Sequence, residues 1–112
     1  MTSQLSSHVL DGSIGRPAVG VRVRLLDADH TLLTEGTTDA DGRVGSLGPA
    51  LLPAGTYHLT FDTGAYFADR GVDTFYPSVT VTIAVEAPGE VIPHYHVPLL
   101  LSPYAYSTYR GS

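Results

Sequence analysis

The chain has 112 residues, 43% of them hydrophobic and 15% charged, which predicts one folded domain over residues 1–112 rather than disorder. Its six cations are all arginine and its net charge is −5, which argues against a nucleic-acid-binding face. It has no cysteine, so disulfides and thiolate metal sites are excluded. Residues 1–7 do not resemble a signal peptide and no run approaches ~18 apolar residues, so we expect a cytoplasmic protein.

Short alternating runs separated by turns follow one another along the chain. In Val21–Leu25 the valines and the leucine should point inward and the arginines outward. The strongest turn signal, Asp39–Gly42, places Arg43 directly after a glycine. Regularly spaced strands of this kind predict an all-β, two-sheet antiparallel sandwich. In chain order we expect strands over residues 6–11, 21–25, 32–38, 57–62 and 78–86, a helix over 63–71, and a hairpin over 94–110.

The final hairpin carries an unusual group of side chains. Residues two apart share a strand face, so His94 and His96 should project together while Tyr95 and Val97 point toward the core. Pro98 cannot donate a hydrogen bond to a neighbouring strand, which predicts a strand edge or a bulge at this position.

These residues alone leave several interpretations open. His94 and His96 could be plain surface, or part of a zinc site with His8 as a third ligand, or general bases with a pKa near operating pH. Arg43 could simply close a turn, or it could offer planar, bidentate donors to a substrate rich in carbonyl groups. His58 should face away from the apolar side of its strand, and we assign it no role.

Three stretches together carry a resemblance. They are Ser7–Asp11 with Gly15–Ala18, Thr38–Arg43, and His94–Pro103 running into Tyr106–Ser112. With them the chain resembles the transthyretin-like 5-hydroxyisourate hydrolases of urate degradation over nearly its whole length. The terminal Tyr-Arg-Gly-Ser is that family's most specific mark, and the hormone carrier transthyretin lacks it. Gly12, where the family pattern has threonine, is a departure in a loop.

The resemblance implies a transthyretin-like Greek-key sandwich of two four-stranded sheets and one short helix. It also implies a homotetramer with active sites at the dimer–dimer interface. The implied reaction is cofactor-free hydrolysis of 5-hydroxyisourate to 2-oxo-4-hydroxy-4-carboxy-5-ureidoimidazoline in purine metabolism, with no metal site. The implied catalytic residues are His8, Arg43, His96 and Ser112. The implied substrate-binding residues are His8, Arg43, His94, Tyr109, Arg110 and Gly111.

Hydrolysis needs a base for water, donors for the developing oxyanion and an acid for the leaving nitrogen. We hypothesise that His8 and His96 share the proton transfers while Arg43 orients the substrate. Ser112 would contribute its hydroxyl and its terminal carboxylate, and the choice of base between the two histidines stays open. One alternative is a transthyretin-type carrier of an aromatic ligand, which would line the same channel with apolar and small side chains. The other alternative is a structural module without chemistry.

Overall fold

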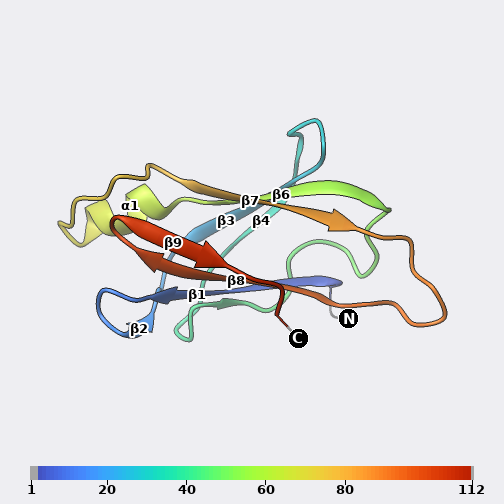
Figure 1. Cartoon of the computed structure of the whole chain (residues 1–112), viewed down its shortest axis with the longest axis horizontal. Coiled ribbons are helices and arrows are strands. Elements are labelled where there is room, and N and C mark those ends of the chain that lie inside the picture. Colours follow the sequence, from blue (N-terminus) through green and yellow to red (C-terminus); the bar gives the residue numbers. More distant parts are fainter. Residues whose placement is uncertain (1–2, 112) are drawn as a thin grey trace.

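The computed structural model describes residues 3–111 and confirms the all-β sandwich. Within that range the chain forms nine strands and one helix, and the strands lie in two facing layers (Figure 1). The strands are β1 (Leu5–Asp11), β2 (Arg16–Pro17), β3 (Arg22–Leu26), β4 (Leu32–Thr37), β5 (Arg43–Val44), β6 (Gly55–Phe61), β7 (Val79–Val85), β8 (Tyr95–Ser102) and β9 (Ala105–Thr108). The helix is α1 (Thr63–Asp69).

The two sheets differ in how their strands pair. One sheet has the order β4-β3-β6-β7, and all of its pairs are antiparallel. The other has the order β2-β1-β8-β9, with the two-residue strand β5 pairing with β1 as a fifth member. Its central pair, β1 with β8, is parallel, so the antiparallel prediction was wrong for this pair. A parallel pair needs a long connection, and here most of the chain runs between the two strands.

The core lies between the inner faces of the two sheets. Val23, Leu25 and Leu59 of the four-stranded sheet are completely buried, as the alternation predicted. From the other sheet, Val97 and Leu99 of β8 are buried against them. Each large apolar side chain buried in this way contributes about 1.5–3 kcal/mol. The opposite faces of both sheets are therefore left for polar and functional residues.

Helix α1 covers one end of the sandwich, and it ends two residues before the position predicted from Gly71 (Figure 1). Its Tyr66 hydroxyl donates a 2.7 Å hydrogen bond to the buried carboxylate of Asp11, at the end of β1. Burial and this hydrogen bond raise the pKa of Tyr66 to about 12, so the phenol stays protonated as a donor. The helix thus fixes one end of the strand that carries His8. Among the described residues, no helix is long and apolar enough to cross a membrane.

Pro98 lies in an interior strand, and the expectation of an edge or a bulge there was wrong. Strand β8 runs between β1 and β9, and its pairing with β1 continues through Pro98 without a register shift. The missing N–H has a different consequence, because the pairing of β8 with β9 reaches only to Leu99. The Thr108 hydroxyl donates to the Pro98 carbonyl oxygen at 2.7 Å. The ladder is therefore interrupted after Thr108 and resumes in the same register at an antiparallel bridge between His96 and Gly111.

Candidate functional site

The turn before β5 is built around the Asp39 side chain. One of its carboxylate oxygens accepts the backbone N–H groups of Asp41 at 2.9 Å and Arg43 at 3.0 Å. The hydrogen bonds from Arg43 and Asp41 hold the pKa of the Asp39 carboxyl below its usual 3.8, so this carboxylate is ionised at neutral pH. A short side chain that accepts backbone N–H groups two and four residues ahead fixes a tight turn. The turn therefore sets the position of Arg43.

Gly42 allows this turn to lie directly against β1. Its φ is +75°, and a Cβ at this position would lie 2.4 Å from the Val9 carbonyl oxygen. The Val9 N–H in turn donates to the Gly42 carbonyl oxygen at 2.7 Å. Only glycine combines a left-handed conformation with so close an approach. As a result β5 pairs with β1, and Arg43 lies opposite His8.

The ring of His8 is held in one tautomer. Its Nε2 lies 2.9 Å from the backbone carbonyl oxygen of Asp41. A carbonyl oxygen can only accept, so Nε2 must carry the proton. In the neutral ring the Nδ1 atom is then free to accept a proton. The turn that places Arg43 thus also orients a potential base beside it.

His94 and His96 project to the same side of the sheet, as predicted, and both reach one hydroxyl. The Ser6 Oγ lies 2.7 Å from Nε2 of His94 and 2.8 Å from Nδ1 of His96. Ser6 is buried and pairs with His96 across the parallel β1–β8 register. His8 follows Ser6 by two residues and so shares its strand face.

A cleft of about 290 Å³ opens over these side chains. We call it the histidine cleft. His8, which lies opposite Arg43, is not among its lining residues. The lining consists of Ser6, Ser7, Arg43, Gly45, His94 and His96. Burial of the ring, followed by the positive charge of Arg43, lowers the pKa of His96 below its usual 6.5, with smaller effects from His8 and His94. His96 is therefore a neutral imidazole at neutral pH, and its Nε2 has no hydrogen-bond partner among residues 3–111.

The end of the described chain passes directly over His96. The Gly111 N–H donates to the His96 carbonyl oxygen at 2.8 Å. A Cβ on Gly111 would lie 2.4 Å from the imidazole Cδ2 of His96, so glycine is needed for this approach. The tail and the ring are thus in van der Waals contact at the rim of the histidine cleft. Ser112, predicted to be catalytic, lies outside the described residues.

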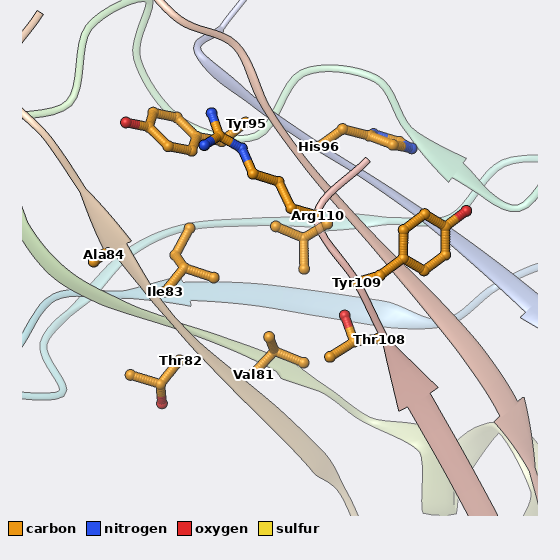
Figure 2. A pocket seen from close by; sticks show the side chains of 10 residues that line it. Val81, Thr82, Ile83, Ala84, Tyr95, His96, Thr108, Tyr109 and Arg110 are labelled. Carbon is orange, nitrogen blue, oxygen red and sulfur yellow. The ribbon is translucent and has the colours of Figure 1, made fainter. Parts of the chain in front are cut away.

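Tyr109 and Arg110 point to different sides of the tail (Figure 2). The Arg110 guanidinium lies over the Tyr95 ring, with its central carbon 4.7 Å from the ring centroid. Tyr95 faces the core side of β8, so the Arg110 side chain points away from the histidine cleft. Tyr109 is 59% exposed, and Figure 2 shows its ring pointing away from Arg110. Both residues line a second cavity, described next, and neither is among the lining residues of the histidine cleft.

A second cavity, of about 310 Å³, lies beside this tail and is the one drawn in Figure 2. One wall is strand β7, the edge of the four-stranded sheet, and the other is β8 with the tail. The side chains of Val81 and Ile83 make this cavity mostly apolar (Figure 2). It lacks Arg43 and His94, and it touches the histidine cleft only through His96.

Of the residues predicted for the site, the structure brings Arg43, His94 and His96 to the histidine cleft and places His8 opposite Arg43, whereas Ser6 was not predicted. A signal was available, because Ser6 lies two residues before His8 and so on the same strand face. Its contact with the histidines depends on the parallel pairing with β8, which periodicity does not reveal. Among residues 3–111, no group of three or more metal-ligating side chains is arranged around a common point.

Comparison with known proteins gives consistent matches. The HIUase/Transthyretin family model matches residues 5–111. The 5-hydroxyisourate hydrolase of Salmonella dublin is 48% identical over 112 residues, which span 96% of this chain and 80% of that protein. The solved structure of Klebsiella pneumoniae 5-hydroxyisourate hydrolase is 38% identical with a TM-score of 0.87, over 100% of this chain and 97% of that one.

The carrier branch is similar in fold as well. Sea bream transthyretin in complex with thyroxine is 34% identical with a TM-score of 0.86, over 96% of this chain and 94% of that one. The fold alone therefore does not distinguish a hydrolase from a transthyretin. The features that can distinguish them are the sequence identity and the side chains of the histidine cleft. By the extent of these matches, the chain belongs to the HIUase/Transthyretin family.

Proposed function

We propose that this protein hydrolyses 5-hydroxyisourate, opening its six-membered ring to give 2-oxo-4-hydroxy-4-carboxy-5-ureidoimidazoline. The names of the bacterial relatives support this reaction. The observation that carries the proposal is the grouping of Arg43 with two imidazoles at one cleft. Such a group supplies a donor for a carbonyl oxygen and acceptors for the protons of water.

Each residue has a role that its environment supports. Arg43 would bind the substrate carbonyls through its planar guanidinium and stabilise the oxyanion that forms as water attacks. His96 is neutral because of burial and Arg43, and its Nε2 would take the proton from the attacking water. His8, whose Nε2 is bound to the Asp41 carbonyl, would hold the water or a ring nitrogen at Nδ1.

The tail would complete the site. Gly111 lies against His96, and Tyr109 would close one side of the cleft over the bound substrate. We propose that Ser112, the next residue, reaches the same cleft and contributes its hydroxyl. Arg110 would act through its contact with Tyr95, which fixes the path of the tail, rather than by touching the substrate.

We also propose the homotetramer implied by the resemblance, with two sheets meeting over the histidine cleft. The outer face of the β1–β8–β9 sheet supports this assembly, because Leu100 on that face is 41% exposed. The edge strand β7 and the exposed tyrosines of the final hairpin and tail, Tyr104, Tyr106 and Tyr109, offer further contact area. Sedimentation equilibrium would show four chains per particle, and a stable, active monomer would contradict the proposal. The cytoplasmic location expected from the sequence stays a prediction.

The ultraviolet decay of freshly generated 5-hydroxyisourate tests the proposed reaction. The natural chain should accelerate the decay in proportion to its concentration, and Arg43→Ala should remove most of the acceleration. Binding of thyroxine measured on the same sample tests the carrier alternative. Tight thyroxine binding without any acceleration of the decay would refute the hydrolase proposal in favour of a carrier.

A further inference from the structure

Ser6 carries a hydroxyl that His94 and His96 share. Its Oγ is 2.7 Å from Nε2 of His94 and 2.8 Å from Nδ1 of His96, and both distances are those of strong hydrogen bonds. Ser6 itself is only 8% exposed, whereas His94 is exposed and His96 is half-buried. The three groups thus form a continuous chain of hydrogen bonds along the wall of the histidine cleft, from the exposed ring of His94 to the half-buried ring of His96.

The hydroxyl has a single proton, so it can donate to only one of the two nitrogens. If it donates to His96, then His94 must donate to Ser6, and the proton of His96 sits on Nε2, facing the cleft. If it donates to His94, then His96 donates from Nδ1 to Ser6, and its Nε2 carries a lone pair. In the first arrangement His96 can donate a proton from Nε2 into the cleft, so it is an acid. In the second arrangement Nε2 can accept a proton, so His96 is a base.

We propose that His94, Ser6 and His96 form a proton relay that converts His96 from base to acid within one turnover. The proposal rests on the proposed hydrolysis and adds two residues to its machinery. Ser6 is a positioning residue in this scheme, because it acts through His96. His94 receives and returns a proton in each turnover.

The proton balance of the relay follows from these two arrangements. As the oxygen of water bonds to the substrate carbonyl carbon, Nε2 of His96 takes one proton of that water. The Nδ1 proton of His96 moves to Ser6, and the Ser6 proton moves to Nε2 of His94. His94 is then an imidazolium, and His96 is neutral with its proton on Nε2.

The second half of the turnover reverses the relay. As the carbon–nitrogen bond of the ring breaks, the leaving nitrogen takes the Nε2 proton of His96. The proton stored on His94 returns through Ser6 to Nδ1 of His96, and the starting arrangement is restored. One proton has passed from water to the ring nitrogen, one C–O bond has formed, and one C–N bond has broken. Nothing is oxidised or reduced.

The environments of the two rings explain why the charge would move outward. His96 is partly buried beside the Arg43 guanidinium, and both conditions disfavour an imidazolium there. His94 is exposed to solvent, which stabilises the same charge. Transfer through Ser6 therefore moves the positive charge from the partly buried ring to the exposed one while the substrate carries its developing negative charge.

Turnover of paired variants tests the relay. Ser6→Ala should lower kcat by ~10-fold or more with KM nearly unchanged, short of the ~10²–10⁴-fold that a proton-transferring side chain contributes. Ser6→Thr keeps the hydroxyl and should restore kcat. His94→Gln can keep the hydrogen bond to Ser6 but cannot carry a proton, so it should be as slow as His94→Ala.

Ser3→Ala is the matched structural control. Ser3 is also buried, and its hydroxyl donates to the Leu5 carbonyl oxygen of β1 and accepts the Leu47 N–H at 2.8 Å, but it contacts no imidazole among the described residues and does not line the histidine cleft. This variant should lose stability comparable to Ser6→Ala and keep the natural kcat. Equal slowing of Ser6→Ala and Ser3→Ala would overturn the relay, because loss of a buried hydroxyl next to β1 would then explain both.

Nitrogen-15 signals of the imidazoles provide a readout that does not depend on turnover. In the natural chain, protonation of His94 should change the tautomer signals of His96, and Ser6→Ala should abolish this coupling. Unchanged ring signals in Ser6→Ala would overturn the relay, as would a kcat that Ser6→Thr fails to restore. If protonation of His94 still changes the signals of His96 in a chain that does not hydrolyse 5-hydroxyisourate, the proposed function is refuted. The hydrogen-bonded relay is then a property of the site without that reaction.

Discussion

Two pairs of neighbouring histidines lie on opposite sheets, and they differ in what surrounds them: His30, in the turn after β3, with His58 of β6, and His94 with His96 of β8. On the four-stranded sheet, the His30 and His58 rings stack with centroids 4.3 Å apart, and His58 bonds to the Thr82 hydroxyl at 2.7 Å. On the other sheet, His94 and His96 share a buried serine and lie beside a guanidinium. The same residue type thus forms a surface stack in one place and the centre of a cleft in the other.

The contrast shows that what a histidine can do here depends on the residues around it. For His96 these residues come from distant parts of the sequence. His58 receives its partner from the adjacent antiparallel strand, in an ordinary cross-strand pair. His96 receives Ser6 from the other end of the chain, Arg43 from a turn, and Gly111 from the tail. Its neighbourhood therefore combines burial, a fixed positive charge and a hydrogen-bonded hydroxyl.

The largest expected difference between the two pairs is in turnover. His96→Ala and His8→Ala should each slow hydrolysis by ~10²–10⁴-fold, because each removes a positioned acid or base. His58→Ala, on the opposite sheet, should keep the natural rate. Steady-state kinetics on 5-hydroxyisourate measure all three. The contrast fails if His58→Ala is as slow as His96→Ala, or if both cleft variants turn over normally.

A smaller loss should follow from disturbing the tail. In Gly111→Ala the new Cβ would lie 2.4 Å from the His96 ring, so the tail or the ring must shift. A misplacement of about 1 Å in an active site can lower the rate by about 100-fold. Gly89→Ala is the control, because a Cβ added there would meet no atom within 4 Å and the variant should stay fully active. A Gly111→Ala enzyme with natural kinetics would show that the tail plays no part in the site.

The free energy of unfolding should fall when the turn before Arg43 is disturbed. Gly42→Ala places a Cβ on a residue at φ +75° and 2.4 Å from the Val9 carbonyl oxygen. The left-handed conformation alone costs roughly 1–2 kcal/mol for a non-glycine residue, and the contact adds to it. Urea unfolding measures the loss. Gly12→Ala is the control and should be nearly neutral, since its Cβ would make an ordinary 3.5 Å contact. An equal loss of stability in both variants would contradict the requirement for glycine at position 42.

The pH profile should show the smallest effect. Because the pKa of His96 is lowered, its Nε2 remains a base below pH 6.5, and the acid limb of kcat/KM should lie below that value. Arg43→Gln removes the second cause of the shift and should move the limb toward 6.5. The same shift makes the unfolded chain bind this proton more readily, so the folded state loses stability as the pH falls below 6.5. An acid limb above 6.5 in the natural chain would contradict the role of His96 as the neutral base.

Local features of the chain were predictable from sequence. Strand alternation gave the inward faces of β3 and β6, and two-residue spacing placed His94 and His96 on one side. The glycine of the Asp39–Gly42 turn indicated the tight approach that positions Arg43. These features depend on neighbours within a few residues, so periodicity and turn chemistry are sufficient to reveal them.

Long-range pairing was not predictable in the same way. Ser6 and His94 are 88 residues apart, and their contact requires that β1 and β8 run parallel. No local pattern distinguishes a strand that pairs in parallel from one that pairs antiparallel. Pro98 was misjudged for the same reason, because its interior position depends on which strands flank β8. The sequence therefore indicated the candidate residues, while the hydroxyl that links two of them came from the topology.

The most direct test is to follow the ring signals of all five histidines while a stable purine-dione analogue of the substrate is added. The signals of His8, His94 and His96 should move together as the analogue fills the histidine cleft. The signals of His30 and His58 should stay in place. Movement of the stacked pair with no change in the other three would place the ligand on the wrong sheet and contradict the proposed site.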